Sequence, residues 1–143
     1  MTRTMNEKLL VLDNNNLIVR ESAENYLKTI LILHKKYGEV RSIDVANELG
    51  VSKPSVSIAM KKLRNEGLVS MDENRNLVLT EAGLEYATAI FERHEVLEKF
   101  LTDVLNVDEE TAHNDSCRLE HLVSAETLNR VREICDMTRP IIS

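Results

Sequence analysis

Side chains that commonly bind metal ions gather in one stretch of this 143-residue chain: His94, Glu98, His113, Cys117, Glu120 and His121. His94 and Glu98 are four residues apart, and Cys117 is followed by a carboxylate and an imidazole after three and four residues. On a helix, such spacings place side chains on one face. A mixture of imidazole, carboxylate and thiolate suits Fe²⁺, Mn²⁺, Co²⁺ or Zn²⁺ better than Ca²⁺ or Mg²⁺. The pattern therefore predicts one or two transition-metal sites.

Each of these residues, taken alone, also has an ordinary structural explanation. His94 could pair with an exposed acid, Cys117 could fill a core and His121 could cap a helix. Repetition of the four-residue spacing on consecutive segments favours metal binding over these separate explanations. His34 and Cys135 have no ligand-type neighbours at such spacing, so we expect them to be structural.

The composition is that of a small globular protein, with 43% apolar and 29% charged residues. A chain of this size forms one domain or two small coupled ones, which excludes a large multidomain enzyme. No apolar run approaches the roughly 18 residues that would cross a bilayer, and the N-terminus lacks a secretory pattern. We therefore expect a cytoplasmic protein with no membrane partner. Only two cysteines are present and Trp is absent, which argues against a disulfide scaffold and against a base-stacking platform.

Hydrophobic periodicity and turn residues predict a mainly α-helical fold. The expected elements are helices over 22–37, 42–49 and 52–66, a β-hairpin over 68–79, and helices over 80–104, 108–121 and 125–136. Ser22, Ser52 and Thr80 are expected to cap their helices, and Gly50 to end the second one. This order of elements is that of a winged helix-turn-helix.

The order of the expected elements predicts that the chain is divided into three segments. Residues 1–20 would be an N-terminal extension, and residues 21–80 a winged helix-turn-helix DNA-binding domain with the small β-hairpin as its wing. Residues 81–143 would form a helical metal-binding domain.

The net charge of −6 is unevenly distributed along the chain. Residues 1–80 carry 12 Lys and Arg against 10 Asp and Glu, whereas residues 81–143 carry 6 against 14. An acidic protein can still bind nucleic acid where its basic groups gather on one face. The segment 52–64 holds four positive charges and no negative one, and small polar residues at its start allow close approach to phosphates and base edges. We therefore expect double-stranded DNA as a partner.

The candidate DNA-contacting residues lie near the starts of the first two helices, along the third helix and on the wing. They are Ser22, Ser42, Ser52, Lys53, Pro54, Ser55, Ser57, Ile58, Lys61, Lys62, Arg64 and Arg75. Their basic members would neutralise phosphates and release counterions. The alternative is an ordinary solvated basic helix, but the order of the elements and the following hairpin favour DNA binding.

The winged helix and two acidic stretches together resemble the diphtheria-toxin-repressor family of metal-dependent transcriptional regulators, which includes the manganese transport regulators. The stretches are ERHEVLEKFL at 92–101 and HNDSCRLEH at 113–121, and the similarity covers about residues 21–137. The resemblance implies a homodimer formed through the helical metal-binding domain. It also implies a repressor of iron or manganese uptake genes, and not an enzyme. Fe²⁺ or Mn²⁺ would be the corepressor, with Co²⁺, Ni²⁺ or Zn²⁺ as substitutes in vitro.

The resemblance also implies two metal sites. Its primary site matches Asn25, Cys117, Glu120 and His121, and its ancillary site matches His94, Glu98 and His113. Asn25 stands where iron-type members carry Met and manganese-type members carry Asp, and Lys28 replaces a second manganese-type carboxylate. Cys117 stands where manganese-type members carry Glu, which favours iron. The implied mechanism is a cation that links the first helix to the second domain and so sets the spacing of two recognition helices.

Two other functions fit parts of the sequence. A winged-helix regulator could respond to a small ligand or to oxidation of Cys117 in place of a metal. A small thiol or metal hydrolase could use Cys117 with His121. Against the hydrolase, both residues would lie within about one turn of one helix, with no glycine-rich turn or separate oxyanion donor nearby.

Overall fold

The computed structural model describes residues 17–138 of the chain. Its contacts divide the chain between Thr88 and Ala89 into two compact units, and each unit is described by itself. The division falls later than the predicted domain boundary at 80/81, inside a long helix. Residues 1–16 of the predicted N-terminal extension lie outside the described part of the chain.

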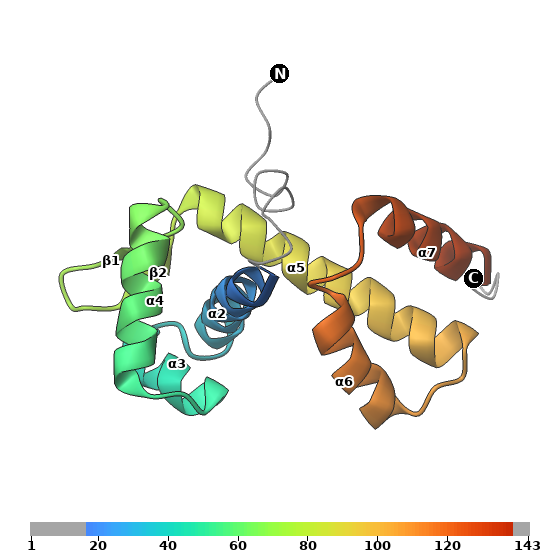
Figure 1. Cartoon of the computed structure of the whole chain (residues 1–143), viewed down its shortest axis with the longest axis horizontal. Coiled ribbons are helices and arrows are strands. Elements are labelled where there is room, and N and C mark those ends of the chain that lie inside the picture. The colour runs from blue at the N-terminus through green and yellow to red at the C-terminus, as the bar shows by residue number, and fades with distance from the viewer. Residues whose placement is uncertain (1–16, 139–143) are drawn as a thin grey trace, which may run out of the picture. The chain divides into compact units, whose positions relative to one another are not determined.

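The first unit contains three helices and a two-stranded sheet (Figure 1). In order, these are α2 (Leu17–Tyr37), α3 (Ser42–Leu49), α4 (Lys53–Asn65), β1 (Val69–Met71) and β2 (Leu77–Leu79), before the start of α5 (Glu81–Lys99). α2 contacts α3, α4 and β2, and α4 contacts β1. Its core side chains are apolar and almost fully buried: Leu27, Ile30, Leu31, Val45, Val56, Met60, Leu63 and Leu68. The predicted mainly helical fold with a small hairpin is confirmed.

The first helix begins earlier than predicted. α2 begins at Leu17, so Ser22 lies inside the helix and does not cap it, and the predicted extension loses its last residues to α2. A serine inside a helix costs under about 1 kcal/mol relative to alanine, which packing readily offsets. Arg20 and Glu24 are 7% and 2% exposed, and the Tyr86 hydroxyl donates a 2.5 Å hydrogen bond to Glu24 Oε2. The helix around Ser22 is therefore packed through Arg20 and Glu24, and Ser22 does not mark its start.

Local caps fix the ends of the helix-turn-helix. Ser52 Oγ accepts a hydrogen bond of 3.3 Å from the backbone N–H of Ser55 at the start of α4. Gly50 ends α3 with a φ of 65°, a conformation that costs glycine little. Thr80 Oγ1 accepts a 3.0 Å bond from the backbone N–H of Gly83 at the start of α5. The predicted caps at Ser52, Gly50 and Thr80 are confirmed.

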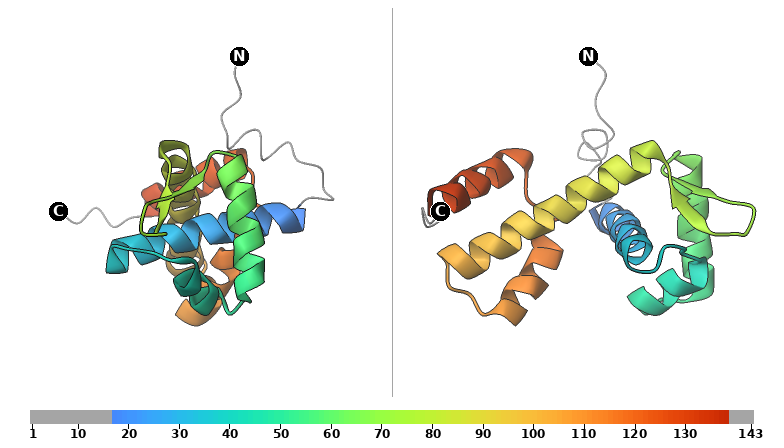
Figure 2. Two further views of the ribbon diagram at one scale, coloured as in Figure 1. Left: turned by 90° about the vertical axis from the view of Figure 1, so that its left-hand side faces the viewer. Right: turned by 180° about the vertical axis from the view of Figure 1, so that it is seen from behind.

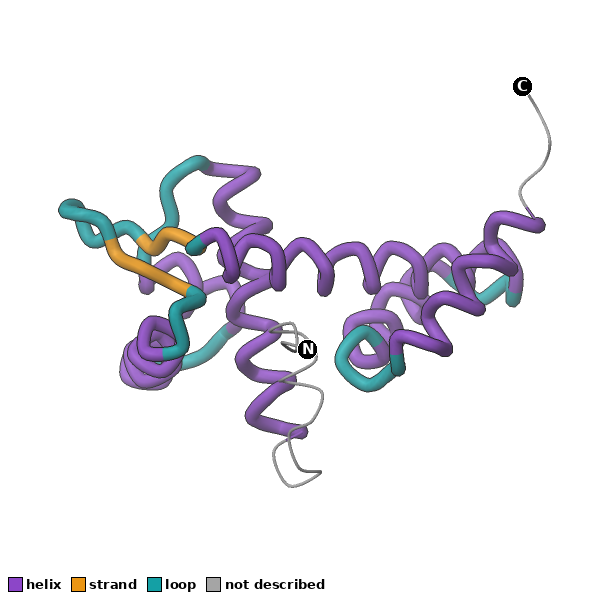
Figure 3. Tube along the Cα trace, turned by 90° about the horizontal axis from the view of Figure 1, so that it is seen from above, coloured by secondary structure: helices purple, strands orange, loops and turns teal. Residues whose placement is uncertain are grey.

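The predicted wing is a short antiparallel hairpin, in which β1 pairs with β2 (Figure 3). In its loop, the Asp72 carboxylate accepts hydrogen bonds from the backbone N–H groups of Asn74 and Asn76, at 2.9 and 2.8 Å. These bonds, chiefly the one from Asn76, lower the pKa of Asp72 below its usual value. Arg75 adopts a φ of 64° and is exposed. The loop therefore holds Arg75 at its surface by local hydrogen bonding.

The second unit contains the rest of α5, the π-helical turn η2 (Phe100–Val104), α6 (Glu109–Leu119) and α7 (Ala125–Thr138) (Figure 2). η2 contacts both α6 and α7. The predicted helix over 80–104 therefore changes from an α-helix to a π-helix at its end. There the Leu105 N–H bonds to the Phe100 carbonyl, five residues back, at 3.2 Å. The Thr102 hydroxyl donates to the Glu98 carbonyl at 3.0 Å, which competes with regular helical bonding. Within the described residues, none of the helices combines the length and apolar character needed to cross a bilayer.

Gly83 leaves no room for a side chain. A Cβ atom at this position would lie 1.8 Å from the carbonyl oxygen of Leu68. Alanine favours helices by about 1 kcal/mol over glycine, but we expect Gly83→Ala to lower the free energy of unfolding by about 1–3 kcal/mol through this clash. Urea denaturation measures the change, with Glu85→Ala at an exposed position of the same helix as a near-neutral control. A free energy of unfolding for Gly83→Ala equal to that of the wild type would contradict the close packing of α5 on the hairpin.

Candidate metal centre and nucleic-acid interface

Glu120 provides the most deeply buried charge in the group of predicted ligands. It directly follows α6, and both it and His121 are almost inaccessible, at 0% and 1% exposed. Glu120 Oε2 lies 2.9 Å from His94 Nδ1, and Glu120 Oε1 lies 3.3 Å from His121 Nε2. Each carboxylate oxygen therefore faces one imidazole, and a buried carboxylate without such partners would be strongly disfavoured.

Glu98 joins the two remaining histidines from the other side. Its Oε2 lies 2.8 Å from His94 Nε2, the ring nitrogen that faces away from Glu120. Its Oε1 lies 3.5 Å from His113 Nδ1. His94 and Glu98 both belong to α5, where their four-residue spacing places them on one face as predicted. A single carboxylate thus contacts one histidine of its own helix and one of α6.

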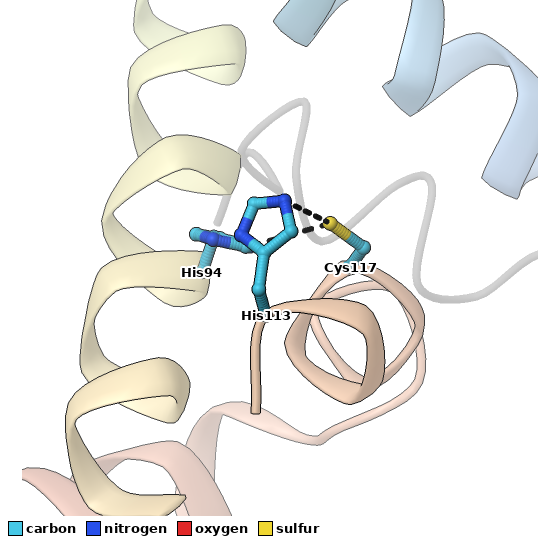
Figure 4. A group of neighbouring side chains, drawn as sticks. All are labelled: His94, His113 and Cys117. Carbon is cyan, nitrogen blue, oxygen red and sulfur yellow. Dashed lines mark hydrogen bonds between the residues drawn. The ribbon is translucent and has the colours of Figure 1, made fainter. Parts of the chain in front are cut away.

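Cys117 completes the group. Its Sγ lies 3.7 Å from His113 Nε2 and 3.9 Å from His94 Nδ1, and Figure 4 shows the two rings converging on the sulfur. One ligand atom from each of these three residues lies within 4.8 Å of the others. The two imidazole rings meet edge to face, with centroids 5.1 Å apart.

These contacts connect all six predicted ligands of the second unit in one network. His94, from the implied ancillary set, contacts Glu98 of its own set and also Glu120 and Cys117 of the implied primary set. The network offers imidazole nitrogen, carboxylate oxygen and thiol sulfur, with His94, Glu120 and His121 buried and the His113 side chain 57% exposed. These donors fit a first-row divalent transition metal. Asn25 lies half-buried on α2 in the first unit, and its role as a ligand stays a prediction.

Arg93 supports the centre, although sequence reasoning did not identify it. It is 6% exposed, and its Nη2 donates a 3.0 Å hydrogen bond to the Val123 carbonyl. This bond ties the segment that follows His121 to α5. In the sequence, an arginine beside His94 in an acidic, helical segment looks like an ordinary exposed charge, so its burial could not be predicted.

The first unit presents the predicted nucleic-acid interface on α4. Val56, Met60 and Leu63 are buried on one side of this helix. The remaining candidates of the helix and its cap are exposed: Ser52, Lys53, Pro54, Ser55, Ser57, Ile58, Lys61, Lys62 and Arg64. Ile58 is 73% exposed, which is unusual for an isoleucine and suits contact with a thymine methyl group. The helix therefore has one apolar face in the core and one cationic face in solvent.

A cleft of about 690 Å³ opens beside this cationic face, between α4 and the hairpin. Ser57, Lys61 and Arg64 line one side of it and Ser70 lines the other. Ser70 was not among the predicted residues, but strand alternation places it on the outward face of β1. Of the other candidates, Ser22 and Arg75 are exposed and Ser42 is half-buried.

A divalent cation that binds this centre should stabilise the folded chain. At about 100 times its dissociation constant, Mn²⁺ should raise the free energy of unfolding by about 2.7 kcal/mol. Glu120→Gln should lose most of this gain, because it removes the buried charge that attracts the cation. Urea denaturation in Mn²⁺ and in chelator measures both values. The matched control is Glu133→Gln on α7, whose side chain is 60% exposed. If Mn²⁺ raised the free energy of unfolding equally in Glu120→Gln and Glu133→Gln, the cation would bind away from Glu120.

Both halves of the chain match models of one protein family. The N-terminal DNA-binding domain of iron-dependent repressors matches residues 19–77, and their metal-binding and dimerisation domain matches residues 80–139. The transcriptional regulator MntR of Escherichia coli is 41% identical over 113 residues, which cover 79% of this chain and 72% of MntR. The diphtheria toxin repressor of Corynebacterium diphtheriae is 32% identical over 120 residues, which cover 83% of this chain and 53% of the repressor.

Solved structures show the same fold. The manganese regulator SloR superimposes with a TM-score of 0.71 and 32% identity, over 80% of this chain and 53% of SloR. A manganese-dependent transcriptional repressor in complex with manganese gives a TM-score of 0.73 and 31% identity, over 80% of this chain and 52% of the repressor. The chain thus spans about half the length of these solved proteins. From both family models and from its identity to MntR and the diphtheria toxin repressor, the chain belongs to the iron-dependent repressor family.

Proposed function

We propose that the chain is a metal-dependent, DNA-binding transcriptional regulator that represses iron or manganese uptake genes. The main observation in support of this proposal is that the fully buried Glu120 carboxylate lies between two imidazoles. That arrangement occurs in a chain whose other unit exposes a cationic, acid-free helix. A cation site and a DNA-reading helix in one small chain are the two parts that a metal-responsive repressor requires.

Fe²⁺ or Mn²⁺ is the proposed corepressor. A bound cation supplies the positive charge that compensates a buried carboxylate. We propose Cys117, Glu120 and His121 as ligands of the primary site, with Asn25 as the fourth. We propose His94, Glu98 and His113 as ligands of the ancillary site. The contacts within the second unit support both groups as cation ligands, since every one of these six side chains faces another ligand atom.

The partner is double-stranded DNA. In this proposal, α4 enters the major groove, its lysines and arginine neutralise phosphates, and the exposed serines near its start approach the bases. Arg75 on the wing contacts the flanking backbone. A homodimer, for which the match to a dimerisation domain provides support, would place two such helices about one helical turn of DNA apart, or a multiple of it.

α5 offers a route from cation to DNA, because this one helix carries residues of both units. Tyr86 on α5 bonds to Glu24 of α2 within the first unit. About two turns later on the same helix, His94 contacts Glu98 and Glu120 within the second unit. A cation that orders His94 can therefore favour one conformation of the DNA-binding dimer, and a coupling of about 1–3 kcal/mol changes DNA affinity about 5–150-fold.

The same proposal assigns no enzymatic activity to the chain and places it in the cytoplasm, with the DNA it binds. Its relatives are transcriptional regulators. The two alternatives from the sequence, a regulator controlled by oxidation of Cys117 and a hydrolase that uses Cys117 with His121, leave Glu98 and His113 without a role. A metal centre uses all six side chains.

Loss of a primary ligand should uncouple DNA binding from metal. A duplex selected from a random library in Mn²⁺ should bind the wild type about 5–150-fold more tightly in Mn²⁺ than in chelator. His121→Ala and Glu120→Gln should remain folded dimers whose DNA affinity no longer responds to Mn²⁺. Gel-shift titration measures this response, and size-exclusion chromatography with light scattering checks the dimer. Unchanged metal-dependent shifts in both variants would refute the ligand assignment.

The cationic face of α4 should determine the salt dependence of DNA binding. Each lost phosphate contact reduces the slope of log K against log salt by about 0.9. Lys61→Ala with Lys62→Ala should therefore reduce the slope by about 1.8. Lys36→Ala is the control, because Lys36 is exposed on α2 outside the proposed interface and should keep the wild-type slope. A double variant with an unchanged slope would show that α4 does not face the phosphates.

A further inference from the structure

We propose that the cavity between α2, the hairpin and the start of α5 binds a small primary amine with an apolar body. The cavity has a volume of about 280 Å³, near the lower limit of ligand pockets, which suits a ligand of small size. Among the residues that the structure describes, none of those proposed to bind DNA or metal lines this cavity. The inference therefore concerns a different site and does not depend on the proposed function.

The walls of the cavity are mainly apolar and partly fixed. Ile30, Val40 and Leu77 form a buried side of it. The backbone N–H of Leu77 donates a 2.6 Å hydrogen bond to the Val40 carbonyl, which ties the hairpin to the segment between α2 and α3. Val78 and Leu84 also line the cavity and are 43% and 48% exposed. An apolar ligand body would remove part of this apolar surface from water, which favours binding.

Asn76 brings an unsatisfied hydrogen-bond acceptor to the cavity. Its side chain is 5% exposed, and it lines the cavity together with Asp72. Asn76 Nδ2 donates a 3.1 Å hydrogen bond to Asp72 Oδ2, which orients the amide group. Asn76 Oδ1 is buried and has no hydrogen-bond partner among the described residues. Because a buried acceptor without a partner is costly, a ligand N–H that enters the cavity and reaches this oxygen would be favoured.

The other polar side chains of the cavity also call for a donor. Glu39 and Asp72 contribute carboxylates, and His34 is the only other lining residue with an ionisable side chain. Arg41 attracts the Asp72 carboxylate, but it does not line the cavity. A primary ammonium group carries three N–H donors and no acceptor, so it complements two carboxylates and the Asn76 oxygen. An anionic ligand would face both carboxylates and would be repelled.

The position of the cavity gives the ligand contact with the proposed wing. Asp72 and Asn76 belong to the loop that holds Arg75 at its surface, and their hydrogen bonds shape that loop. An amine bound beside them would therefore contact the wing directly. The sequence also fits a regulator that responds to a small ligand, and this cavity is a site where such a ligand would act in addition to a metal.

NMR titration of the full-length chain with phenethylamine, in chelator, tests the proposal. The amide signals of Val40, Leu77 and Leu84 should shift together and give one dissociation constant. Phenethyl alcohol, which is neutral, should bind about 10–100-fold more weakly, because it lacks the charged donor. Hydrocinnamate, which is anionic, should not shift these signals. Binding of the alcohol as tight as that of the amine, or amine-induced shifts confined to other residues, would overturn the proposal.

Two variants locate the amine in the cavity. Asn76→Leu removes the unpaired oxygen and should weaken phenethylamine binding about 10–100-fold. Asn74→Leu is the matched control, because Asn74 is exposed in the same loop and does not line the cavity, and it should bind as the wild type does. Val78→Trp, at a half-exposed strand position that tolerates an aromatic residue, should fill the cavity and abolish binding.

The outcomes separate this inference from the proposed function. Wild-type phenethylamine affinity in both Asn76→Leu and Val78→Trp would overturn the amine site and leave a metal-dependent repressor intact. Absence of any binding to the wild type would overturn it as well, and would leave water as the partner of Asn76 Oδ1. Metal-independent DNA binding would instead overturn the proposed function, whatever the amine does.

Discussion

A carboxylate with no access to water dominates the physical chemistry of this protein. Glu120 is fully buried, and its two oxygens face His94 and His121. A charge in such a place needs positive partners, and imidazoles can supply them only through their protons. A divalent cation supplies positive charge directly, so a cation bound here would compensate the buried Glu120 carboxylate. The proposed ligands lie on α5, on α6 and directly after α6, and Arg93 ties the segment that follows His121 to α5.

The geometry of α5 makes this local chemistry relevant to DNA. The helix carries Tyr86, which bonds to Glu24 of α2, and later carries His94 and Glu98. At its end it becomes a π-helical turn that contacts α6 and α7. Such turns often occur near functional sites, and this one begins two residues after Glu98, a proposed ligand. The proposed coupling would need no chain of loops, because α5 itself carries residues of both units.

Much of the site could be predicted from sequence because its information is local. The four-residue spacing of His94 and Glu98 fixes a shared helix face, and the caps at Ser52 and Thr80 act within three residues of themselves. Features that depend on packing between helices were not predictable. The start of α2 before Ser22, the burial of Arg93 and the convergence of two rings on Cys117 all require knowledge of how the helices pack. The role of Asn25 stays a prediction, because the structure of each unit by itself does not test it.

In the proposed function, cation binding and DNA binding are one coupled equilibrium, and coupling of this kind is reciprocal. The most direct measurement is the dissociation constant of Mn²⁺, by titration calorimetry, with and without saturating amounts of a selected DNA duplex. We expect DNA to tighten Mn²⁺ binding by the same factor, about 5–150-fold, by which Mn²⁺ tightens DNA binding. A Mn²⁺ affinity that is identical in the presence and absence of DNA would contradict it.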